Sequence, residues 1–404
     1  MTVSLWMKQQ REETACDVCV IGGGVVGVSM AVFLVRAGLD VLLLERRSIA
    51  EGASGRNAGY LMRGAADNYA VACDDCGRDG AHALWKLSEA NLAMLRGAGV
   101  SSLASYHARP TCLLAYAEDE ARELERSCAL MREDGFDTEI LRSGDDAVWR
   151  AHPPLLALTN PHDAVVNPVE LVRHLAEGIA GRSVVGAEVM RVEADGDGVA
   201  VETRSRTLRC RSAVVCTNAL ARQLLPGEGA SVHANRGQLL ALDAPADSCR
   251  LDFAYYADRG SEYFRRADDR TVIVGGWRKH FETDERTESE MVSADVQSGL
   301  EAFAERVLGK RFGVRDRWAG TMGFTPDGLP IAGETSLPGV WVCAGFNGHG
   351  MSLGHATASI VAHQVATSLG CSPSMSDELP GEVAERVRGL LRPGRFAATA
   401  DGFG

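Results

Sequence analysis

The residues of this chain best suited to bind a ligand form a glycine-rich turn near its start. Gly22, Gly24 and Gly27 have the spacing G-x-G-x-x-G, and apolar runs at 17–21 and 25–36 flank them. Gly22 permits a tight turn, Gly24 lets a pyrophosphate approach the backbone, and Gly27 lets a helix pack closely on a strand. The N–H groups and the dipole of the helix N-terminus favour phosphate. The spacing therefore predicts strand, turn and helix around a dinucleotide.

An acidic residue follows this turn at the distance that nucleotide binding requires. Glu45 ends a second apolar run, 39–44, which we expect to be a buried strand. Its carboxylate would accept hydrogen bonds from a ribose hydroxyl pair, which indicates an adenosine with a free 2′-hydroxyl and argues against NADP. A tight turn in an unrelated α/β protein would not need an acid here.

Composition limits the classes of protein to consider. The chain has 404 residues, 46% hydrophobic and 24% charged, which is enough for two substantial domains. A net charge of −12 gives no support for nucleic acid or an anionic membrane as a partner. No apolar run predicts a secretory signal or a transmembrane helix. The 11 cysteines, odd in number and scattered, favour a reducing compartment, so we expect a cytoplasmic protein.

Two C-x-x-C pairs are candidates for metal or redox sites. Cys16 and Cys19 fall in or beside the opening strand, which favours packing. Cys73 and Cys76 stand in a polar stretch before a predicted helix. A zinc site needs four converging ligands, and neither pair has Cys or His partners nearby, so no metal is expected.

The order of elements predicts a discontinuous nucleotide-binding domain with an insertion. Helices are expected at 78–95, 118–133, 168–180, 288–307, 348–370 and 382–391, and strands at 111–115, 213–217, 236–243, 251–257, 262–267, 271–276 and 340–346. The Asp195–Gly198 turn predicts a hairpin within an antiparallel meander at 184–217. The expected fold class is α/β: a Rossmann-like domain of segments 15–85, 150–230 and 315–370, an antiparallel β-rich substrate domain of 86–149 and 231–314, and a tail, 371–404, with a mobile Gly/Ala end.

Four separated motifs carry a resemblance to a known family. They are VIGGGVVG at 20–27 with Glu45, GASGRNAG at 52–59, GFTPDGLPIAG at 323–333 and AGFNGHGM at 344–351. Together they resemble the D-amino acid oxidase superfamily of FAD-dependent oxidoreductases, which includes glycine, sarcosine and gamma-glutamylputrescine oxidases. The resemblance implies oxidation of a C–N bond in an amine or amino acid, with dioxygen or an electron carrier as acceptor.

The resemblance also implies a set of FAD ligands. Since the segment before TPDG has no cysteine and GASGRNAG has no histidine, it implies non-covalent FAD. A second helix N-terminus after the glycines of 345–350 would stabilise the negative charge that a flavin gains on reduction. The implied FAD ligands are Gly22, Gly24, Gly27, Glu45, Arg46, Ser54, Gly55, Arg56, Asn57, Ala58, Gly59, Val189, Asn218, Gly345, Asn347, Gly348, His349, Gly350 and Met351.

The usual carboxylate-binding residues of the family are missing. Their positions correspond to Met322 and Ser352, neither of which binds an anion strongly. Arg63 and Arg265 are the candidate replacements for binding the substrate, and a surface or structural arginine is the alternative for each. The stretch before TPDG is more similar to the amine and gamma-glutamylputrescine oxidase branch.

Catalytic candidates are fewer, because hydride transfer from a neutral amine demands no acid or base. His349 is a candidate for hydrogen bonding to the flavin, with loop bracing as the alternative. Lys279 stands where sarcosine oxidase-like enzymes place a dioxygen-activating lysine, and Arg278 competes for that position. Tyr256 and Tyr263 are candidates for the wall of an amine pocket.

Three other functions stay open on the sequence. A dehydrogenase of the same fold would pass electrons to a quinone or carrier. A flavin hydroxylase shares the opening motif but needs a late ribose-binding motif that GFTPDGLP does not supply. A non-catalytic FAD subunit would lack turnover as an isolated chain.

Because the sequence lacks the residues to which relatives attach FAD covalently, denaturation of the protein tests how the cofactor is bound. We predict that acid or heat releases all the yellow colour into the supernatant as FAD, measured by chromatography. Flavin that stays with the precipitate would contradict non-covalent binding, and FMN in place of FAD would contradict the role given to Glu45.

Overall fold

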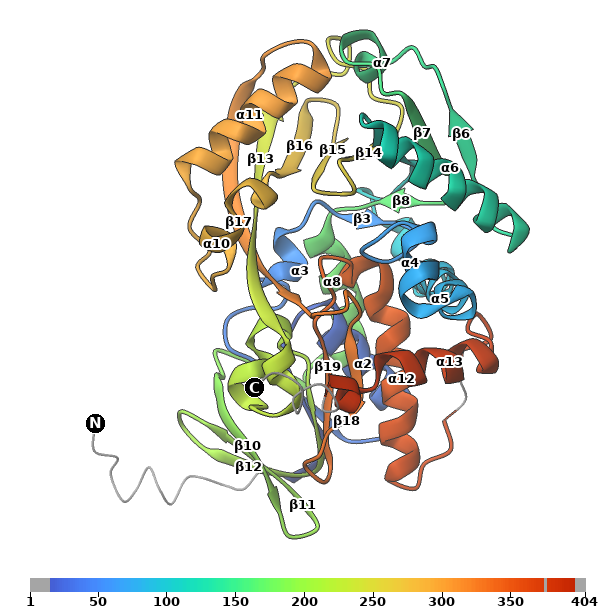
Figure 1. The fold of residues 1–404 in the computed structure, drawn as a ribbon. Coiled ribbons are helices and arrows are strands. Elements are labelled where there is room, and N and C mark those ends of the chain that lie inside the picture. Colours follow the sequence, from blue (N-terminus) through green and yellow to red (C-terminus); the bar gives the residue numbers. More distant parts are fainter. Residues whose placement is uncertain (1–14, 374–375, 397–404) are drawn as a thin grey trace, which may run out of the picture.

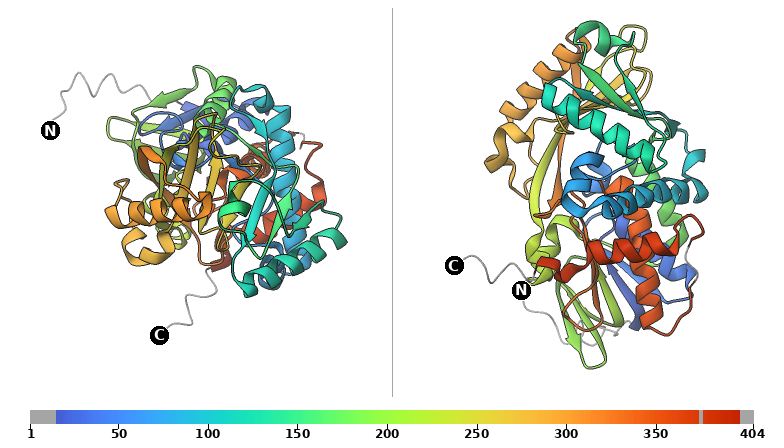
Figure 2. Two further views of the ribbon diagram at one scale, coloured as in Figure 1. Left: turned by 90° about the horizontal axis from the view of Figure 1, so that it is seen from above. Right: turned by 45° about the vertical axis from the view of Figure 1, so that its right-hand side comes forward.

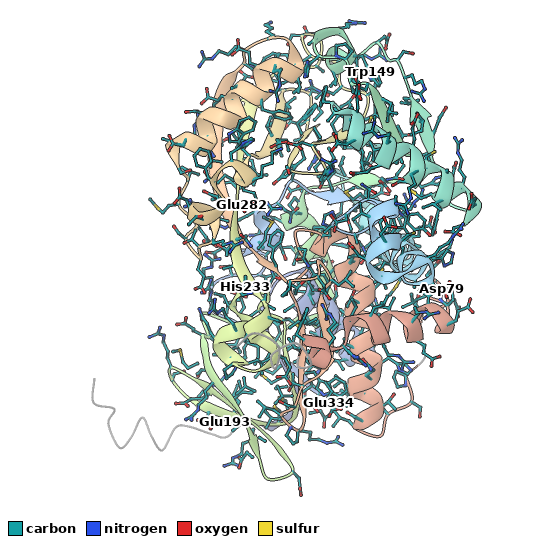
Figure 3. The ribbon with its side chains drawn as sticks, viewed as in Figure 1. Asp79, Trp149, Glu193, His233, Glu282 and Glu334 are labelled. Atoms are coloured by element: carbon teal, nitrogen blue, oxygen red, sulfur yellow. The ribbon has the colours of Figure 1, made fainter. Side chains whose placement is uncertain are left out.

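The computed structural model describes residues 15–373 and 376–396 and contains two eight-stranded sheets and a three-stranded one. One large sheet lies at each end of the molecule (Figure 1). In the view with side chains, Trp149 marks the end that holds the second sheet, while Glu193 and Glu334 mark the end that holds the first (Figure 3). The amino-terminal segment and the predicted Gly/Ala end lie outside the described residues.

The first sheet has the strand order β10-β11-β12-β1-β2-β9, with β19 beside β12 and β18 beside β19. β1 pairs in parallel with β2 and β12, and β12 with β19, which makes a buried parallel centre. The strands are β1 Ala15–Ile21, β2 Val41–Glu45, β9 Ser183–Val185, β10 Val189–Asp195, β11 Gly198–Thr203, β12 Thr207–Val215, β18 Ile331–Glu334 and β19 Val340–Ala344.

The predicted meander is present, but its last strand differs from the expectation. The hairpin turns between β10 and β11 as predicted. The prediction of a separate strand at 213–217 is wrong, because β12 is one continuous strand. It pairs with β11 over its first half and with β1 over most of its length. It therefore joins the hairpin directly to the sheet centre.

Helices cover the first sheet. α2 (Val25–Arg36) packs on α12 (Gly350–Ser368), and α12 packs on α5 (Arg78–Gly97) (Figure 2). The buried Asn91 of α5 fastens the start of α12: its Nδ2 donates to Met351 O at 3.0 Å, and its Oδ1 accepts from the N–H groups of His355 and Ala356. α8 (Pro168–Ala176) packs on α2, and α13 (Gly381–Leu391) on α5.

The second sheet has the order β17-β13-β16-β15-β14-β5-β7-β6. It is antiparallel except where β14 meets β5, and α11 (Ala294–Leu308) and α6 (Glu118–Glu133) cover it. Its strands are β5 Thr111–Ala115, β6 Glu139–Leu141, β7 Leu156–Asn160, β13 His233–Asp243, β14 Ala254–Ala257, β15 Glu262–Arg266, β16 Thr271–Gly276 and β17 Gly313–Phe324.

Short elements lie between the two large sheets or at their edges. A small sheet, β3-β8-β4, consists of Tyr60–Leu61, Ala164–Val165 and His107–Ala108. The remaining helices are α3 Ala53–Arg56, α4 Tyr69–Cys76, α7 Ala147–Ala151, α9 Ala221–Leu224 and α10 Glu282–Glu285. Cys73 and Cys76 therefore lie on α4, directly before the predicted helix, α5. No helix among the described residues is both long and apolar enough to cross a membrane.

Two elements differ from the prediction for reasons visible in their contacts. α11 begins at Ala294, not at 288, because Glu290 reaches the other domain and binds Arg47, and Ser293 N donates to Gln238 Oε1 at 2.9 Å. β17 was not predicted. Its charged first half lies exposed at the sheet edge, so it has no apolar alternation.

The strand pairings suggest different domain boundaries from those expected. β7 lies in the predicted nucleotide segment 150–230, and most of β17 lies in 315–370, yet both pair within the second sheet. We propose that these two strands belong to the substrate domain, and that α5, which packs on α12, belongs wholly to the nucleotide domain.

A buried ion pair fixes α10 to β13. Arg236 Nη2 lies 2.6 Å from Glu285 Oε1, and their side chains are 10% and 1% exposed. Arg236 also donates to Met291 O at 2.7 Å, and Gln238 donates to Glu285 at 2.9 Å. Because every oxygen of this buried carboxylate is bound, removing the arginine would leave a charge unpaired.

We predict that Arg236→Met lowers the free energy of unfolding by about 3–5 kcal/mol, the cost of breaking a buried pair, as measured by urea denaturation. The matched control is Arg311→Met, which removes an exposed pair with Glu301 and should cost below about 1 kcal/mol. An equal loss of unfolding free energy in the two variants would show that the buried pair contributes no more to stability than the exposed one.

Candidate functional site

A long cavity, here the nucleotide cavity, lies where β1, β2, β12 and β19 end. Parallel strands of an open sheet end at one edge, which is the usual place of a nucleotide. Its lining is Ile21, Gly22, Gly23, Gly24, Val25, Val26, Leu44, Glu45, Arg46, Arg47, Gly52, Ala53, Ser54, Asn57, Ala187, Glu188, Val189, Cys216, Thr217, Asn218, Leu220, Gln223, Leu224, Met322, Cys343, Phe346, Gly348, Gly350 and Met351.

The glycine turn has the close contacts that its sequence predicted. Gly22 has φ +111°, and a Cβ there would lie 2.7 Å from Cys216 O. A Cβ at Gly27 would lie 1.9 Å from Gly22 O, so α2 approaches β1 too closely for any side chain. These contacts hold the start of α2 at the cavity wall.

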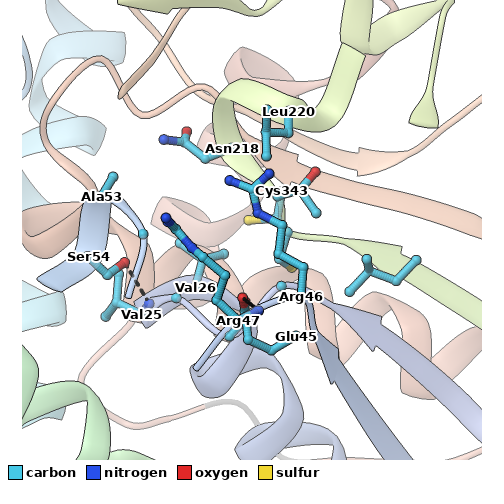
Figure 4. Close-up of a pocket in the computed structure, with 18 of the residues that line it drawn as sticks. Val25, Val26, Glu45, Arg46, Arg47, Ala53, Ser54, Asn218, Leu220 and Cys343 are labelled. Atoms are coloured by element: carbon cyan, nitrogen blue, oxygen red, sulfur yellow. Dashed lines mark hydrogen bonds between the residues drawn. The ribbon is translucent and has the colours of Figure 1, made fainter. Parts of the chain in front are cut away.

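Glu45 is held in place by the turn that it faces. Its Oε2 accepts from Gly23 N at 2.7 Å and its Oε1 from Arg47 N at 2.7 Å (Figure 4). Since each carboxylate oxygen has a further lone pair, both can also accept from ribose hydroxyls. The side chains of Arg46 and Arg47 extend from the end of β2 beside it (Figure 4).

The small-residue loop forms the opposite wall. Ser54 Oγ accepts from Val25 N at 2.9 Å, which binds this loop to the start of α2 (Figure 4). A Cβ at Gly24 would lie 2.8 Å from this hydroxyl. Asn57 braces the loop internally, since its Oδ1 accepts from Gly59 N at 2.7 Å.

The glycine loop before α12 closes the far end. Asn347 has φ +51°, its Oδ1 accepts from Thr325 N at 2.9 Å, and its Nδ2 donates to Gly345 O at 2.7 Å. Asn218 Oδ1 accepts from Gly345 N at 3.0 Å. The first turn of the 19-residue α12 thus faces the cavity, and its partial positive charge favours negative charge there.

The predicted cofactor residues divide into lining and supporting groups. Gly27, Gly55 and Gly345 line neither this cavity nor the two that lie beyond it. Gly27 and Gly55 instead permit close backbone packing, and Gly345 permits close packing on the Thr325 side chain. Sequence reasoning missed Met322, which it treated only as a lost anion ligand, and Gly23 and Arg47, which neighbour named residues. It also missed Ala187, Glu188, Leu220, Gln223, Leu224, Cys343 and Phe346, which carry no recognisable signal.

A second, inner cavity adjoins the first and lies under the second sheet. Its wall includes Tyr60, Tyr256, Tyr263, Arg278 and His349. The rings of Tyr60 and Tyr256 meet edge to face at 4.8 Å, and those of Tyr256 and Tyr263 lie 5.6 Å apart. The structure therefore brings both predicted tyrosines together and adds Tyr60 from β3.

A third, outer cavity shares Tyr256, Arg278, Phe324, Asn347 and His349 with the inner one. Met322, Gly348 and Met351 in turn line both the inner cavity and the nucleotide cavity. The three cavities thus meet in the order nucleotide, inner, outer.

The two arginines proposed to bind substrate are held by the protein itself. Arg265 is 3% exposed, lines none of the three cavities, and donates to the carbonyls of Ala58, Val166 and Arg266. It ties the small-residue loop to β15, so the structural alternative fits it better.

Arg63 lines the outer cavity, but it is 4% exposed and its Nη2 donates to Asp137 O at 2.7 Å. Its Nε lies 3.4 Å from Glu89 Oε1, and its guanidinium lies over Phe136. These partners direct Arg63 toward α5 and the 134–138 turn.

Lys279 and Arg278 are separated by the structure. Lys279 forms an ion pair with Asp258 and lines none of the three cavities. Trp277, with φ +66°, turns the chain after β16 and so directs Arg278 into the inner and outer cavities. Of the two competing residues, Arg278 is the one near the site.

His349 caps the start of α12 at the junction of the inner and outer cavities. Burial lowers its pKa below the usual value, so the ring is neutral at pH 7. Nδ1 lies 3.2 Å from Asn347 O and must carry the proton there, which leaves Nε2 as an acceptor.

These residues fit FAD. The gap that a Cβ at Gly24 would fill and the doubly held Glu45 suit the pyrophosphate and ribose, and the end near Gly348 and Met351 would hold the ring system beside the inner cavity. Among residues 15–373 and 376–396, no group of three or more His, Cys, Asp or Glu side chains could hold a metal.

Comparison with known proteins agrees with this geometry. The family described as FAD dependent oxidoreductase matches residues 17–364. The gamma-glutamylputrescine oxidoreductase of Escherichia coli K12 is 25% identical over 383 residues, covering 87% of this chain and 84% of its own. The structure is similar to that of L-proline dehydrogenase from P. horikoshii (TM-score 0.76, 18% identity, covering 96% and 99%) and to that of glycine oxidase from Geobacillus kaustophilus (TM-score 0.72, 21% identity, covering 90% and 96%).

The fold and the site therefore define a flavoprotein oxidoreductase. The chain belongs to the FAD dependent oxidoreductase family, which confirms the resemblance carried by the four motifs. Its cofactor is FAD.

We predict that Gly24→Val gives colourless protein, because the new side chain would meet Ser54 Oγ and fill the space for the pyrophosphate. The measurement is the ratio of flavin to protein absorbance after purification. Gly97→Val, at the exposed end of α5 with no neighbour within 4 Å, is the control and should retain FAD. A normal flavin ratio in Gly24→Val would show that this turn does not bind the nucleotide.

Proposed function

We propose that this enzyme oxidises a C–N bond in a small amine or amino acid. The observation that carries the proposal is the inner cavity, which lies between the nucleotide cavity and the outer cavity and shares wall residues with both. The names of the relatives, among them gamma-glutamylputrescine oxidoreductase and glycine oxidase, support an amine as substrate.

FAD, when bound, supplies the acceptor for a hydride from the carbon that bears the nitrogen. The chain holds the substrate against it. Tyr60, Tyr256 and Tyr263 form an aromatic wall that excludes water and limits the poses of a small substrate. The imine product would leave through the outer cavity and hydrolyse in water.

His349 has the chemistry to receive the amine. A hydride leaves readily only from the neutral amine, whereas most amines arrive as ammonium ions. Because Nδ1–H is committed to Asn347 O, Nε2 is the ring atom that can accept a hydrogen bond or a proton from the substrate nitrogen. The lowered pKa keeps this atom unprotonated at neutral pH.

The proposed electron acceptor is dioxygen, and a dehydrogenase that passes electrons to a quinone or carrier is the alternative. One observation favours the alternative: Lys279, the candidate for dioxygen activation, is paired with Asp258 outside the three cavities. The rate of reoxidation by air distinguishes the two.

We predict that at least one compound from a panel of D-amino acids, N-methyl amino acids and polyamine derivatives bleaches the flavin under anaerobic conditions, followed by its visible absorbance. Hydroxy acids of matched size are the control and should leave the spectrum unchanged, because they lack the C–N bond. Bleaching by NAD(P)H alone would contradict the proposal and favour a hydroxylase.

A further inference from the structure

We propose that Arg278 binds an anionic group of the substrate, and that the enzyme's preferred amines therefore carry a carboxylate. This inference rests on the proposed function and names the substrate class of the same site. It replaces Arg63 and Arg265, the two arginines that the sequence favoured.

Three arginines besides Arg278 line the inner or the outer cavity, namely Arg56, Arg63 and Arg259. Arg56 donates to the carbonyls of Glu51 and Ala319 and lies 3.3 Å from Glu290. Arg259 binds Asp119 and Glu123, and Arg63 binds Asp137 O and Glu89. Each of these guanidinium groups is held by acceptors of the protein; the buried Nη1 of Arg63 lacks a hydrogen-bond partner, but Arg63 lines the outer cavity and not the inner one.

Arg278 is different. It lines both the inner and the outer cavity, is half-buried, and has no hydrogen bond or ion pair with any other described residue. Its guanidinium carbon lies 4.4 Å from the centre of the Phe324 ring, so one face rests on an aromatic surface while the N–H edge has no protein acceptor. The carboxylates of Glu262 and Glu282 act on this charge without a close ion pair or hydrogen bond. A partly desolvated cation that lacks a direct partner is costly, and an anion hydrogen-bonded to it in the cavity would lower that cost.

Among the described residues that line the inner cavity, no side chain other than Arg278 offers an anion a free positive charge. Met322, on β17, presents a thioether to both the nucleotide and the inner cavity. Ser352 lines the inner cavity, and since its Oγ accepts from Met62 N at 3.1 Å, it can offer an anion only a neutral hydroxyl donor. Among the inner-cavity residues, Arg278 is the cation with free donors.

Arg278 lies apart from the cavity that would hold the cofactor. It lines the inner and outer cavities but not the nucleotide cavity. An anion bound to it would therefore lie on the side of the inner cavity away from FAD, and the aromatic wall would lie alongside the carbon chain. This arrangement orients the nitrogen-bearing carbon toward the cofactor.

The backbone supports a defined direction for this side chain. Trp277 adopts φ +66° directly before Arg278, and its indole packs over α11, where a Cβ at Gly299 would lie 1.9 Å from Trp277 Nε1. The ring of His280 packs against that of Trp277, with the ring centres 4.2 Å apart and the planes tilted by 37°. The turn is thus anchored on both sides of the arginine.

The test uses the FAD-loaded enzyme and a carboxylate that cannot be oxidised. Benzoate is titrated into the protein while the flavin absorbance is followed, and benzamide serves as the neutral counterpart of the same shape. We expect the wild type to bind benzoate more tightly than benzamide. Arg278→Met should weaken benzoate binding by about 10- to 150-fold, the loss of a charge-assisted hydrogen bond, and leave benzamide binding unchanged. Arg278→Lys should recover part of the loss.

The matched control is Arg306→Met. Arg306 also lies over a phenylalanine, Phe303, at 5.5 Å, but it is exposed on α11 and lines none of the three cavities. Its removal should leave both affinities unchanged. FAD content and melting temperature are measured for every variant, and Arg278→Gln replaces Arg278→Met if the latter loses FAD.

Equal benzoate affinity in the wild type and Arg278→Met would overturn the inference, as would a wild type that binds benzamide as tightly as benzoate. A variant in which only reoxidation by dioxygen slows would also overturn it, because the arginine would then act on the acceptor. Failure of the proposed function has another signature: no amine bleaches the flavin, although benzoate still reports on the anion site.

Discussion

The close contact between α2 and β1 is the constraint on which the rest of the structure depends. A Cβ at Gly27 would lie 1.9 Å from Gly22 O, so the helix can begin directly at the end of the strand only with glycine at this position. That contact places the glycine turn beside Glu45, which accepts from Gly23 N, and the first N–H group of α2, that of Val25, beside Ser54 of the small-residue loop. The nucleotide cavity exists because these backbones approach so closely.

The second sheet depends on the first through a few polar connections. Arg265 ties β15 to the small-residue loop, and Asn347 ties the segment after β17 to the glycine loop before α12. Glu290 joins the link before α11 to Arg47 beside the nucleotide cavity. These connections hold the second sheet near the end of the nucleotide cavity that Gly348 and Met351 line, and the inner cavity adjoins that end.

The sequence predicted the parts of the molecule that rest on local constraints. The glycine turn, α2 and the place of Glu45 at the end of a strand were predicted correctly, since turn geometry and helix packing follow from residues close in the chain. β17 was missed because half of it is a charged edge strand, and α4 because its polar end resembles a loop. The sequence could not predict where the Arg265 side chain points, because the carbonyls that bind it, those of Ala58 and Val166, lie about 200 and 100 residues away in the chain. That the Arg278 side chain has no hydrogen bond or ion pair can be seen only in the folded structure, where the residues around it come together.

The inner cavity is the proposed site of the reaction, and the most direct test is a crystal structure of the FAD-loaded protein. We predict that electron density for the isoalloxazine ring lies at the junction of the nucleotide and inner cavities, in contact with Met322, Gly348 and Met351, with the adenosine ribose on Glu45. A ring system placed away from the inner cavity, or a ribose not bound by Glu45, would contradict the account.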